Sequence, residues 1–261
     1  MTPESFRAPV ADVVASQVTH ERTFWENDPF ERPGSDTVEN LVNKAVDAAI
    51  FDAIISGYGS QFAGARRILE LGGGQGWASC LVKRRYPAAH VVVSDAVEAA
   101  IAGRPIWERV FDTRLDGAVA APAQSLPVPD GSADLLFCFA AAHHFIDYDA
   151  ALREAHRILT PGGSCLWLYE PTSPRFWHGM AESRVNRKRA DVPEHVIVPS
   201  TVLEIARRIG FDAQVTLAPD GVRRGRVTPI YYGVLSLVPL LARVLPCTAH
   251  FTFRKAGEVR G

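Results

Sequence analysis

Residues 68–76, with the sequence ILELGGGQG, place a short apolar segment directly before a glycine-rich turn, and the carboxylate of Glu70 stands near the junction. Glycine lets the backbone take a positive φ and come close to a bound molecule. The residues that follow, 77–85, can form a helix whose first amide N–H groups point back at the turn. A strand, a tight turn and a helix start in this order predict a nucleotide-sized cradle at the carboxyl edge of a parallel sheet.

The spacing of the turn distinguishes between classes of nucleotide. The dinucleotide fingerprint G-x-G-x-x-G/A needs a small residue at its last position, and counting from Gly72 that position is Trp77. A carboxylate beside the turn would also repel a pyrophosphate, whereas it suits a ligand with a cationic end. A nicotinamide-dependent enzyme is therefore the least favoured class. An ordinary strand–loop–helix junction is the alternative for this motif taken alone.

Strand and helix signals alternate from about residue 66 to residue 170, which is the pattern of a parallel α/β sheet. The sequence predicts strands at 67–71, 90–95, 117–121, 133–141, 164–169, 211–218 and 249–255. It predicts helices at 75–85, 96–102, 105–112, 149–159 and 201–209, the last with Ser200 as its N-cap and Gly210 at its end. The stretch 133–141 is nearly all apolar, as expected for a strand that is buried on both faces.

Two stretches without a strand pattern complete the domain organisation. We expect residues 1–65 to form a helical amino-terminal cap or lid, with 38–55 as the clearest helix. Residues 66–261 are expected to form one α/β domain. The insertion at about 172–199 follows the fifth strand, where such segments usually shape an acceptor pocket.

Further motifs follow the glycine turn. Asp95 ends the second predicted strand, from which an acid can accept hydrogen bonds from a ribose diol or cap the next helix. The remaining motifs are the turn LPVPDG at 126–131, the pair His143–His144 after the fourth strand, and the segment EAHRILTPGG at 154–163. Together with the acidic-x-G-x-G-x-G spacing from Glu70 to Gly76, they closely resemble the motifs of class I S-adenosylmethionine-dependent methyltransferases over roughly residues 66–215.

The resemblance implies a Rossmann-like α/β fold with a seven-stranded, mostly parallel sheet, helices on both faces and an antiparallel last strand. It also implies S-adenosyl-L-methionine as the cofactor. The family's acid before the LPVPDG turn, which meets the adenine amino group, is replaced here by Pro122, so backbone groups of the next two residues are expected to take its place. The expected cofactor-binding residues are Glu70, Gly72, Gly74, Gly76, Asp95, Ala123, Gln124 and Ala140.

The implied activity is methyl transfer to a small-molecule acceptor, with a hydroxyl oxygen as the favoured acceptor atom. A neutral imidazole or a carboxylate can take a proton from such an acceptor near neutral pH. The candidates for this role are His143, His144, Glu170 and His195, and packing or shaping of the pocket is the alternative for each. Two other functions stay open: a non-methylating reaction of the same cofactor, such as a cyclisation or decarboxylation, and cofactor binding without catalysis.

Composition narrows the classes of partner. A net charge of −1 gives no global field for nucleic acid, and the four scattered cysteines predict neither a disulfide framework nor a zinc site. The most apolar stretch, 229–246, is shorter than the roughly 20 apolar residues that a membrane span needs. It is also broken by Pro239 and carries Arg243. A core or lid helix is favoured there over contact with a lipid-like substrate. We expect a cytoplasmic protein without a metal, and the sequence leaves its acceptor and oligomeric state open.

Overall fold

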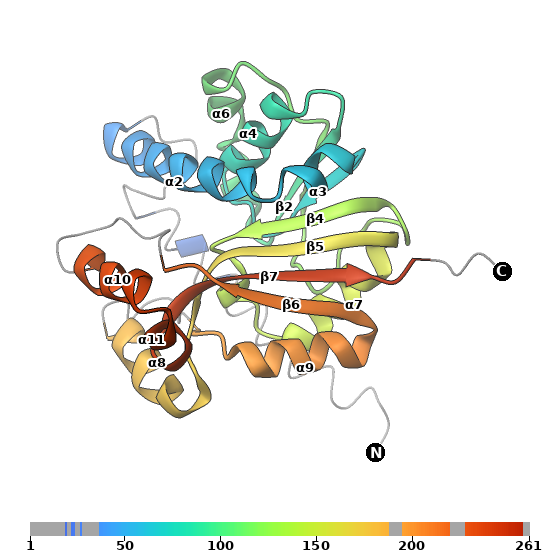
Figure 1. The fold of residues 1–261 in the computed structure, drawn as a ribbon. Helices are drawn as coiled ribbons and strands as arrows, with labels where there is room; N and C mark the ends of the chain where they lie inside the picture. The colour runs from blue at the N-terminus through green and yellow to red at the C-terminus, as the bar shows by residue number, and fades with distance from the viewer. Residues whose placement is uncertain are drawn as a thin grey trace.

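The computed structural model describes residues 19, 22, 23, 27, 37–187, 195–219 and 228–257. The strands are β1 (Arg67–Glu70), β2 (His90–Asp95), β3 (Gly117–Ala120), β4 (Ala133–Phe139), β5 (Leu159–Thr172), β6 (Phe211–Leu217) and β7 (Cys247–Lys255). They form one seven-stranded sheet in the order β3-β2-β1-β4-β5-β7-β6 (Figure 1). Strand β7 runs antiparallel to both of its neighbours, and the pairs from β3 to β5 are parallel. The predicted fold class is confirmed.

The helices are α2 (Val38–Ser56), α3 (Gly59–Gly64), α4 (Trp77–Arg85), α5 (Glu98–Ile101), α6 (Arg104–Val110), α7 (Tyr148–Ile158), α8 (His178–Asn186), α9 (Pro199–Ile209), α10 (Thr228–Leu237) and α11 (Pro239–Val244). Short 3-10 turns precede α7 and α8, namely η1 (Ala142–His144) and η2 (Arg175–Trp177). Side-chain caps explain two of the starts, because Thr37 accepts from the N–H of Asn40 and Asp147 accepts from the N–H of Ala150.

Three of the boundaries that differ from the sequence prediction have a local physical reason. Helix α9 begins at Pro199 after Val198 as its N-cap, so the prediction of Ser200 as N-cap was wrong; proline fits the first helical position because its missing N–H would have no partner there. Strand β4 stops at Phe139 because Ala140 takes a positive φ of 48°. Strand β5 begins five residues early, since the predicted turn at 161–163 is an irregularity within its pairing to β4.

The apolar stretch at 229–246 forms two helices rather than one. Pro239 is the first residue of α11, so the chain changes direction between α10 and α11 at the residue that lacks a backbone N–H. Among the described residues, no helix has the length and apolarity that crossing a membrane needs.

The core lies on both faces of the sheet, as the nearly continuous apolar sequence of β4 predicts. Leu135 and Phe137 belong to a buried cluster with residues of α2, α3, α4 and α6. Leu136 and Cys138, on the opposite face of the same strand, pack with residues of α7 and α9. Alternate side chains of one strand therefore serve two helical layers, which is the arrangement of a doubly covered sheet.

The carboxyl ends of the parallel strands meet at one edge of the sheet. Figure 1 shows α8, α10 and α11 at the edge toward which β4 points, while the arrowhead of β7 points the other way. Helix α2 covers part of one sheet face, and most of the rest of the predicted cap lies outside the described residues. The division into a cap over 1–65 and a domain over 66–261 therefore stays a prediction.

We expect Phe51→Ala to lower the free energy of unfolding by about 3–5 kcal/mol, because it empties a fully buried position. The Phe51 ring lies 5.8 Å from that of Trp77, 5.7 Å from that of Phe137 and 5.3 Å from that of Phe139. Val42→Ala on the same helix is the control, since Val42 is 58% exposed and such a change costs about 0.5 kcal/mol or less. Urea denaturation measures both; equal losses would contradict the packing of α2 on the sheet.

Candidate functional site

The glycine turn after β1 has the backbone conformation that its sequence predicts. Gly72, Gly74 and Gly76 have φ values of +62°, +53° and +75°, a region that residues with a side chain rarely enter. Gly76 is the N-cap residue of α4, and its N–H donates to the carbonyl of Gly73 over 2.9 Å. The three glycines therefore present backbone, without side chains, at the carboxyl end of β1.

Gly73 is a constrained position that sequence reasoning missed. A Cβ on this residue would lie 2.5 Å from Cγ2 of Val93 and 2.7 Å from Cδ of Glu70, so no larger residue fits without displacing its neighbours. Its N–H donates to the carbonyl of Ser94 over 2.8 Å. The alternating spacing drew attention to the other three glycines, and the only signal for Gly73 is that the GGG sequence is unbroken.

Asp95 ties the end of β2 to the glycine turn. One carboxylate oxygen accepts the N–H of Gly74 and the other accepts the N–H of Val97, each over 2.8 Å. The N-cap of α5 is Val97, so the alternative in which Asp95 caps that helix was wrong. Burial raises the pKa of Asp95 above its usual value, and the two backbone hydrogen bonds oppose that shift.

Glu70 lies behind the turn and joins β1 to α4. Its carboxylate is buried and accepts hydrogen bonds from the backbone N–H and the hydroxyl of Ser79. Burial raises the pKa of Glu70 from 4.5 to about 8, since the charged form loses solvation that two hydrogen bonds only partly replace. This carboxyl is thus a buried group whose ionised form a nearby cation would stabilise.

The loop after β3 comes to the same edge of the sheet. Its first residue, Ala121, donates its N–H to the carbonyl of Asp95 over 2.9 Å. Ala123 and Gln124 are the two central residues of a turn that the N–H of Ser125 closes on the carbonyl of Pro122 over 3.0 Å. Ala123 is buried and Gln124 half-buried, and their turn follows within three residues of Ala121 at the end of β2.

The structure brings His143 and Glu170 into direct contact. Nδ1 of His143 lies 2.8 Å from Oε2 of Glu170. Glu170 is fully buried, and its two oxygens also accept the N–H groups of Ala141, Ala142 and His143 over 2.9–3.2 Å. A carboxylate that accepts from Nδ1 places the proton of a neutral imidazole on that nitrogen, which leaves Nε2 with its lone pair.

The other two histidines lie next to this pair. The His144 ring centre is 4.1 Å from that of His143. The backbone N–H of His195 donates to the carbonyl of His143 over 3.3 Å, and Nδ1 of His195 lies 3.0 Å from Oε1 of Glu182 on α8. The end of the insertion is therefore joined to the tip of β4, and all four predicted catalytic candidates lie in one region.

Tyr148 is a further polar residue here that sequence reasoning did not select. Its hydroxyl is buried without a hydrogen-bond partner among the described residues. Burial, with smaller contributions from the carboxylates of Glu170 and Glu182, raises the pKa of Tyr148. As the first residue of an amphipathic helix, it carried no signal in the sequence other than its place after Asp147.

The glycine turn lies against the residues that follow β4, the segment to which His143 belongs. A Cβ built on Gly72 would lie 3.0 Å from Cβ of Ala141 and 3.7 Å from the ring of Phe145. Ala140, at the tip of β4, holds its strained backbone in place by donating its N–H to the carbonyl of Leu168 over 2.9 Å. The residues after β1 and those after β4 are therefore in van der Waals range of each other.

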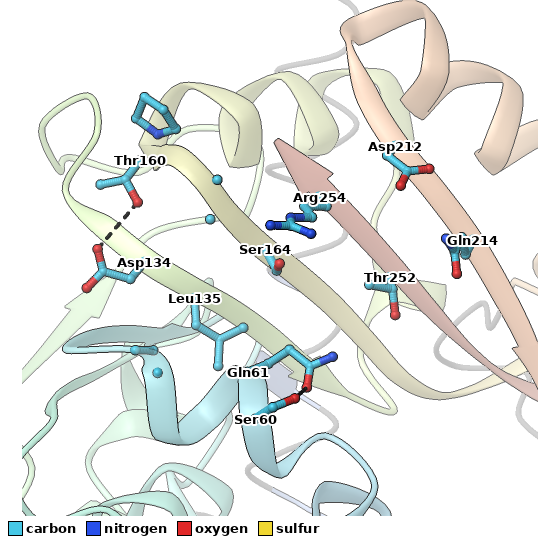
Figure 2. Close-up of a pocket in the computed structure, with 15 residues that line it drawn as sticks. Ser60, Gln61, Asp134, Leu135, Thr160, Ser164, Asp212, Gln214, Thr252 and Arg254 are labelled. Atoms are coloured by element: carbon cyan, nitrogen blue, oxygen red, sulfur yellow. Dashed lines mark hydrogen bonds between the residues drawn. The ribbon is translucent and has the colours of Figure 1, made fainter. Parts of the chain in front are cut away.

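A separate pocket lies at the opposite edge of the sheet, where the parallel strands begin (Figure 2). Asp134 and Leu135 of β4, Ser164 of β5 and Arg254 of β7 line it, with residues of α3 at one side. None of the predicted site residues belongs to its lining. The side chain of Asp134 pairs with Arg67 over 2.8 Å, so this carboxylate serves the start of the sheet rather than the site. Within the described part of the chain, no group of three or more His, Cys, Asp or Glu side chains is arranged to hold a metal ion.

We expect the pH dependence of stability to reveal Glu70. Because its pKa is raised in the folded state, the folded protein holds this proton more tightly than the unfolded chain, so the free energy of unfolding falls as pH rises from 4.5 to about 8. Glu70→Gln keeps an acceptor for Ser79 and removes the titration, so its decline over this range should be shallower by a few kcal/mol. Urea denaturation across that range tests this; parallel profiles for the two proteins would show that Glu70 does not titrate in this way.

Comparison with known proteins agrees with this geometry. The model of a family described as a methyltransferase domain matches residues 69–167. A demethylmenaquinone methyltransferase of Thermus thermophilus is 36% identical over 117 residues, which are 44% of this chain and 52% of that protein. A malonyl-acyl-carrier-protein O-methyltransferase of Halorhodospira halophila is 34% identical over 102 residues, which are 39% of this chain and 34% of that protein. The matches thus span about half or less of these relatives.

The same fold occurs among solved structures. A geranyl diphosphate C-methyltransferase of Streptomyces coelicolor superposes with a TM-score of 0.65 at 13% identity, covering 92% of this chain and 98% of that one. At this identity the superposition speaks for the fold alone. Residues 69–167 thus match a methyltransferase domain, and the sheet order and the glycine turn agree with the resemblance to class I S-adenosylmethionine-dependent methyltransferases.

Proposed function

We propose that this protein binds S-adenosyl-L-methionine at the glycine turn and transfers its methyl group to a small-molecule acceptor, with a hydroxyl oxygen as the favoured atom. The contact between His143 and Glu170 beside the turn carries the second half of the proposal. The family match at residues 69–167 supports the first half. Both halves concern the same edge of the sheet.

The residues at the turn fit this cofactor. Positive φ values at three glycines leave the backbone uncovered where the methionine moiety would lie. The carboxyl of Glu70 is buried behind the turn, and a ligand with a cationic sulfonium and ammonium would favour its ionised form. The two oxygens of Asp95 each accept one backbone N–H, and every carboxylate oxygen has a further lone pair for a ribose hydroxyl. Backbone groups of Ala123 and Gln124 would face the adenine.

The acceptor side is best explained by His143 as the base and Glu170 as its positioning residue. When bound, the cofactor supplies a methyl group on a good leaving group, so the protein's main task is alignment, which can contribute about 7–11 kcal/mol. Nε2 of His143 would take the proton of the acceptor hydroxyl as its oxygen is methylated, and Glu170 would stabilise the imidazolium. Proton removal of this kind contributes about 10²–10⁴-fold. His144 and His195 would shape the surrounding pocket, and Ala140 would lie on the cofactor side of it.

The relatives leave the acceptor atom open. One is named for demethylmenaquinone and another for O-methylation of a malonyl-acyl-carrier protein, so both a ring compound and a carboxylate oxygen are represented. The hydroxyl acceptor rests on the His143–Glu170 pair, because a base is needed most where a proton must leave the nucleophile. Formation of S-adenosylhomocysteine during turnover separates methyl transfer from a cyclisation or decarboxylation with the same cofactor.

We expect Gly74→Val to abolish binding of S-adenosylhomocysteine, measured by calorimetry. The substitution places a branched side chain in the turn at a φ of +53°. Gly131→Val is the matched control, because Gly131 has a φ of +59° and lies in open space before β4, at the other end of that strand. The control shares the backbone strain but not the cradle. Equal affinity in the two variants would remove the cofactor from the glycine turn.

We expect His143→Ala to lower kcat by about 10²–10⁴-fold with a hydroxyl acceptor, while the affinity for S-adenosylhomocysteine changes little. Glu170→Gln should lower kcat as well and shift its pH profile, since an amide supports the imidazolium less well than a carboxylate does. His90→Ala is the control, because His90 is exposed at the start of β2. The assay measures S-adenosylhomocysteine over a panel of phenols, alcohols and acids. Unchanged kcat in His143→Ala would assign the proton transfer to another group.

A further inference from the structure

Helices α10 and α11 expose an unusually apolar surface. Among residues 229–244, the exposed positions include three polar side chains: Tyr231, Ser236 and Arg243. Arg243 is the one charged residue among them. We call the exposed large apolar side chains of this stretch the apolar face. Their exposed fractions run from 36% to 83%. They are Ile230, Tyr231, Val234, Leu237, Val238, Leu240 and Val244. A surface of this kind marks a site of interaction.

The apolar face is not simply the outside of a core helix pair. The inward side chains Leu235 and Ala242 pack with Cys247 in a small buried cluster of their own. Tyr231 and Tyr232 fix α10 to the chain before and within β7, by hydrogen bonds to the carbonyl of Pro246 and the hydroxyl of Thr248. The inner side of the helix pair is thus held by its own buried cluster and by the two tyrosine hydrogen bonds. The outer side is apolar, although its aliphatic side chains are not part of that buried cluster.

Positive charge surrounds this face. Residues 221–257 contain no aspartate or glutamate, although the whole chain has 29 acidic residues. Arg243 lies on α11, and Arg184 of α8 is close enough to Tyr231 to lower its pKa against the effect of burial. Exposed Arg175 and Arg187 flank α8, whose neighbourhood also exposes Phe176 and Met180. Within 173–187 the one carboxylate is Glu182, which pairs with His195.

We propose that the apolar face docks on the surface of an anionic lipid bilayer. Apolar side chains would enter the boundary between headgroups and acyl chains, while the arginines beside them contact the phosphates. The contact is peripheral, since neither helix is long enough to span. Because α8, α10 and α11 lie at the carboxyl edge of the sheet (Figure 1), docking turns that edge toward the bilayer.

Charge favours a bilayer over a second copy of the chain as the occupant. In a two-fold symmetric dimer the same patch meets itself, so the arginines around one apolar face would approach those of the other. No carboxylate on α10 or α11 offsets that repulsion. A bilayer with anionic headgroups supplies both the apolar layer and the negative charge. The proposal depends on exposure and charge, and it stands whether or not the chain transfers methyl groups.

Co-sedimentation of the full-length protein with vesicles tests the proposal. We expect clear binding to vesicles of phosphatidylcholine mixed with phosphatidylglycerol, weaker binding to phosphatidylcholine alone, and a loss of binding as salt is added. Leu237→Glu combined with Leu240→Glu should weaken binding to the mixed vesicles by about tenfold or more. Arg184→Glu combined with Arg243→Glu should remove the preference for anionic lipid.

The matched control is Val38→Glu combined with Val42→Glu, which adds the same charges at exposed valines of α2, 71% and 58% exposed. This variant should bind vesicles nearly as the unchanged protein does, allowing for its added negative charge. Light scattering measures the oligomeric state of each variant in parallel. The proposal fails if the unchanged protein binds no vesicle, if the Leu237/Leu240 and Val38/Val42 variants lose binding equally, or if the Leu237/Leu240 variant instead converts a dimer to a monomer.

Discussion

Hydrogen bonds from backbone N–H groups to buried carboxylates hold the carboxyl edge of this sheet in shape. Glu70 at the end of β1 accepts from the first turn of α4, Asp95 at the end of β2 accepts from the glycine turn, and Glu170 in β5 accepts from η1. Each carboxylate therefore fixes a loop that belongs to another element. Where the carboxylate is ionised, such bonds are about twice as strong as neutral ones, which offsets part of the cost of burial. Loss of any one of them would release a loop of the site rather than a single side chain.

Two of these carboxyl groups, Glu70 and Asp95, explain why this edge suits a cationic ligand. Burial raises the pKa of Glu70 and of Asp95 because their charged forms lose solvation. A bound cation would offset that loss. Arginine and lysine side chains pair instead at the other end of the strands, as Arg67 does with Asp134 and Lys83 with Asp116. The described structure thus separates an edge of buried carboxyl groups, whose ionised form a sulfonium would favour, from an edge where carboxylates are neutralised by surface cations.

How far the sequence predicted this site depended on whether the constraint was local. The bounds of β2, the positive φ of three glycines and the end of α9 at Gly210 follow from propensity and turn chemistry within a few residues, and they were predicted correctly. The need for glycine at 73 comes from Val93, which lies twenty residues away in the sequence. The contact of Glu170 with η1 likewise depends on the pairing of β5 with β4. Such constraints appear only once the strands are placed side by side.

Hydropathy has the same limit at residues 229–246, where it predicted a core or lid helix. Apolar composition shows that side chains avoid water but not what they meet instead, and among the described residues one stripe of each helix meets protein. Pro239 divides the segment into two short helices, so each buries little and leaves the other side open. Buried positions in 221–257 exclude acids because buried carboxylates are costly, but at the exposed positions of α10 and α11 their absence serves no purpose for the core. It does serve one at an anionic surface, because a single carboxylate there would repel the phosphates that the arginines attract.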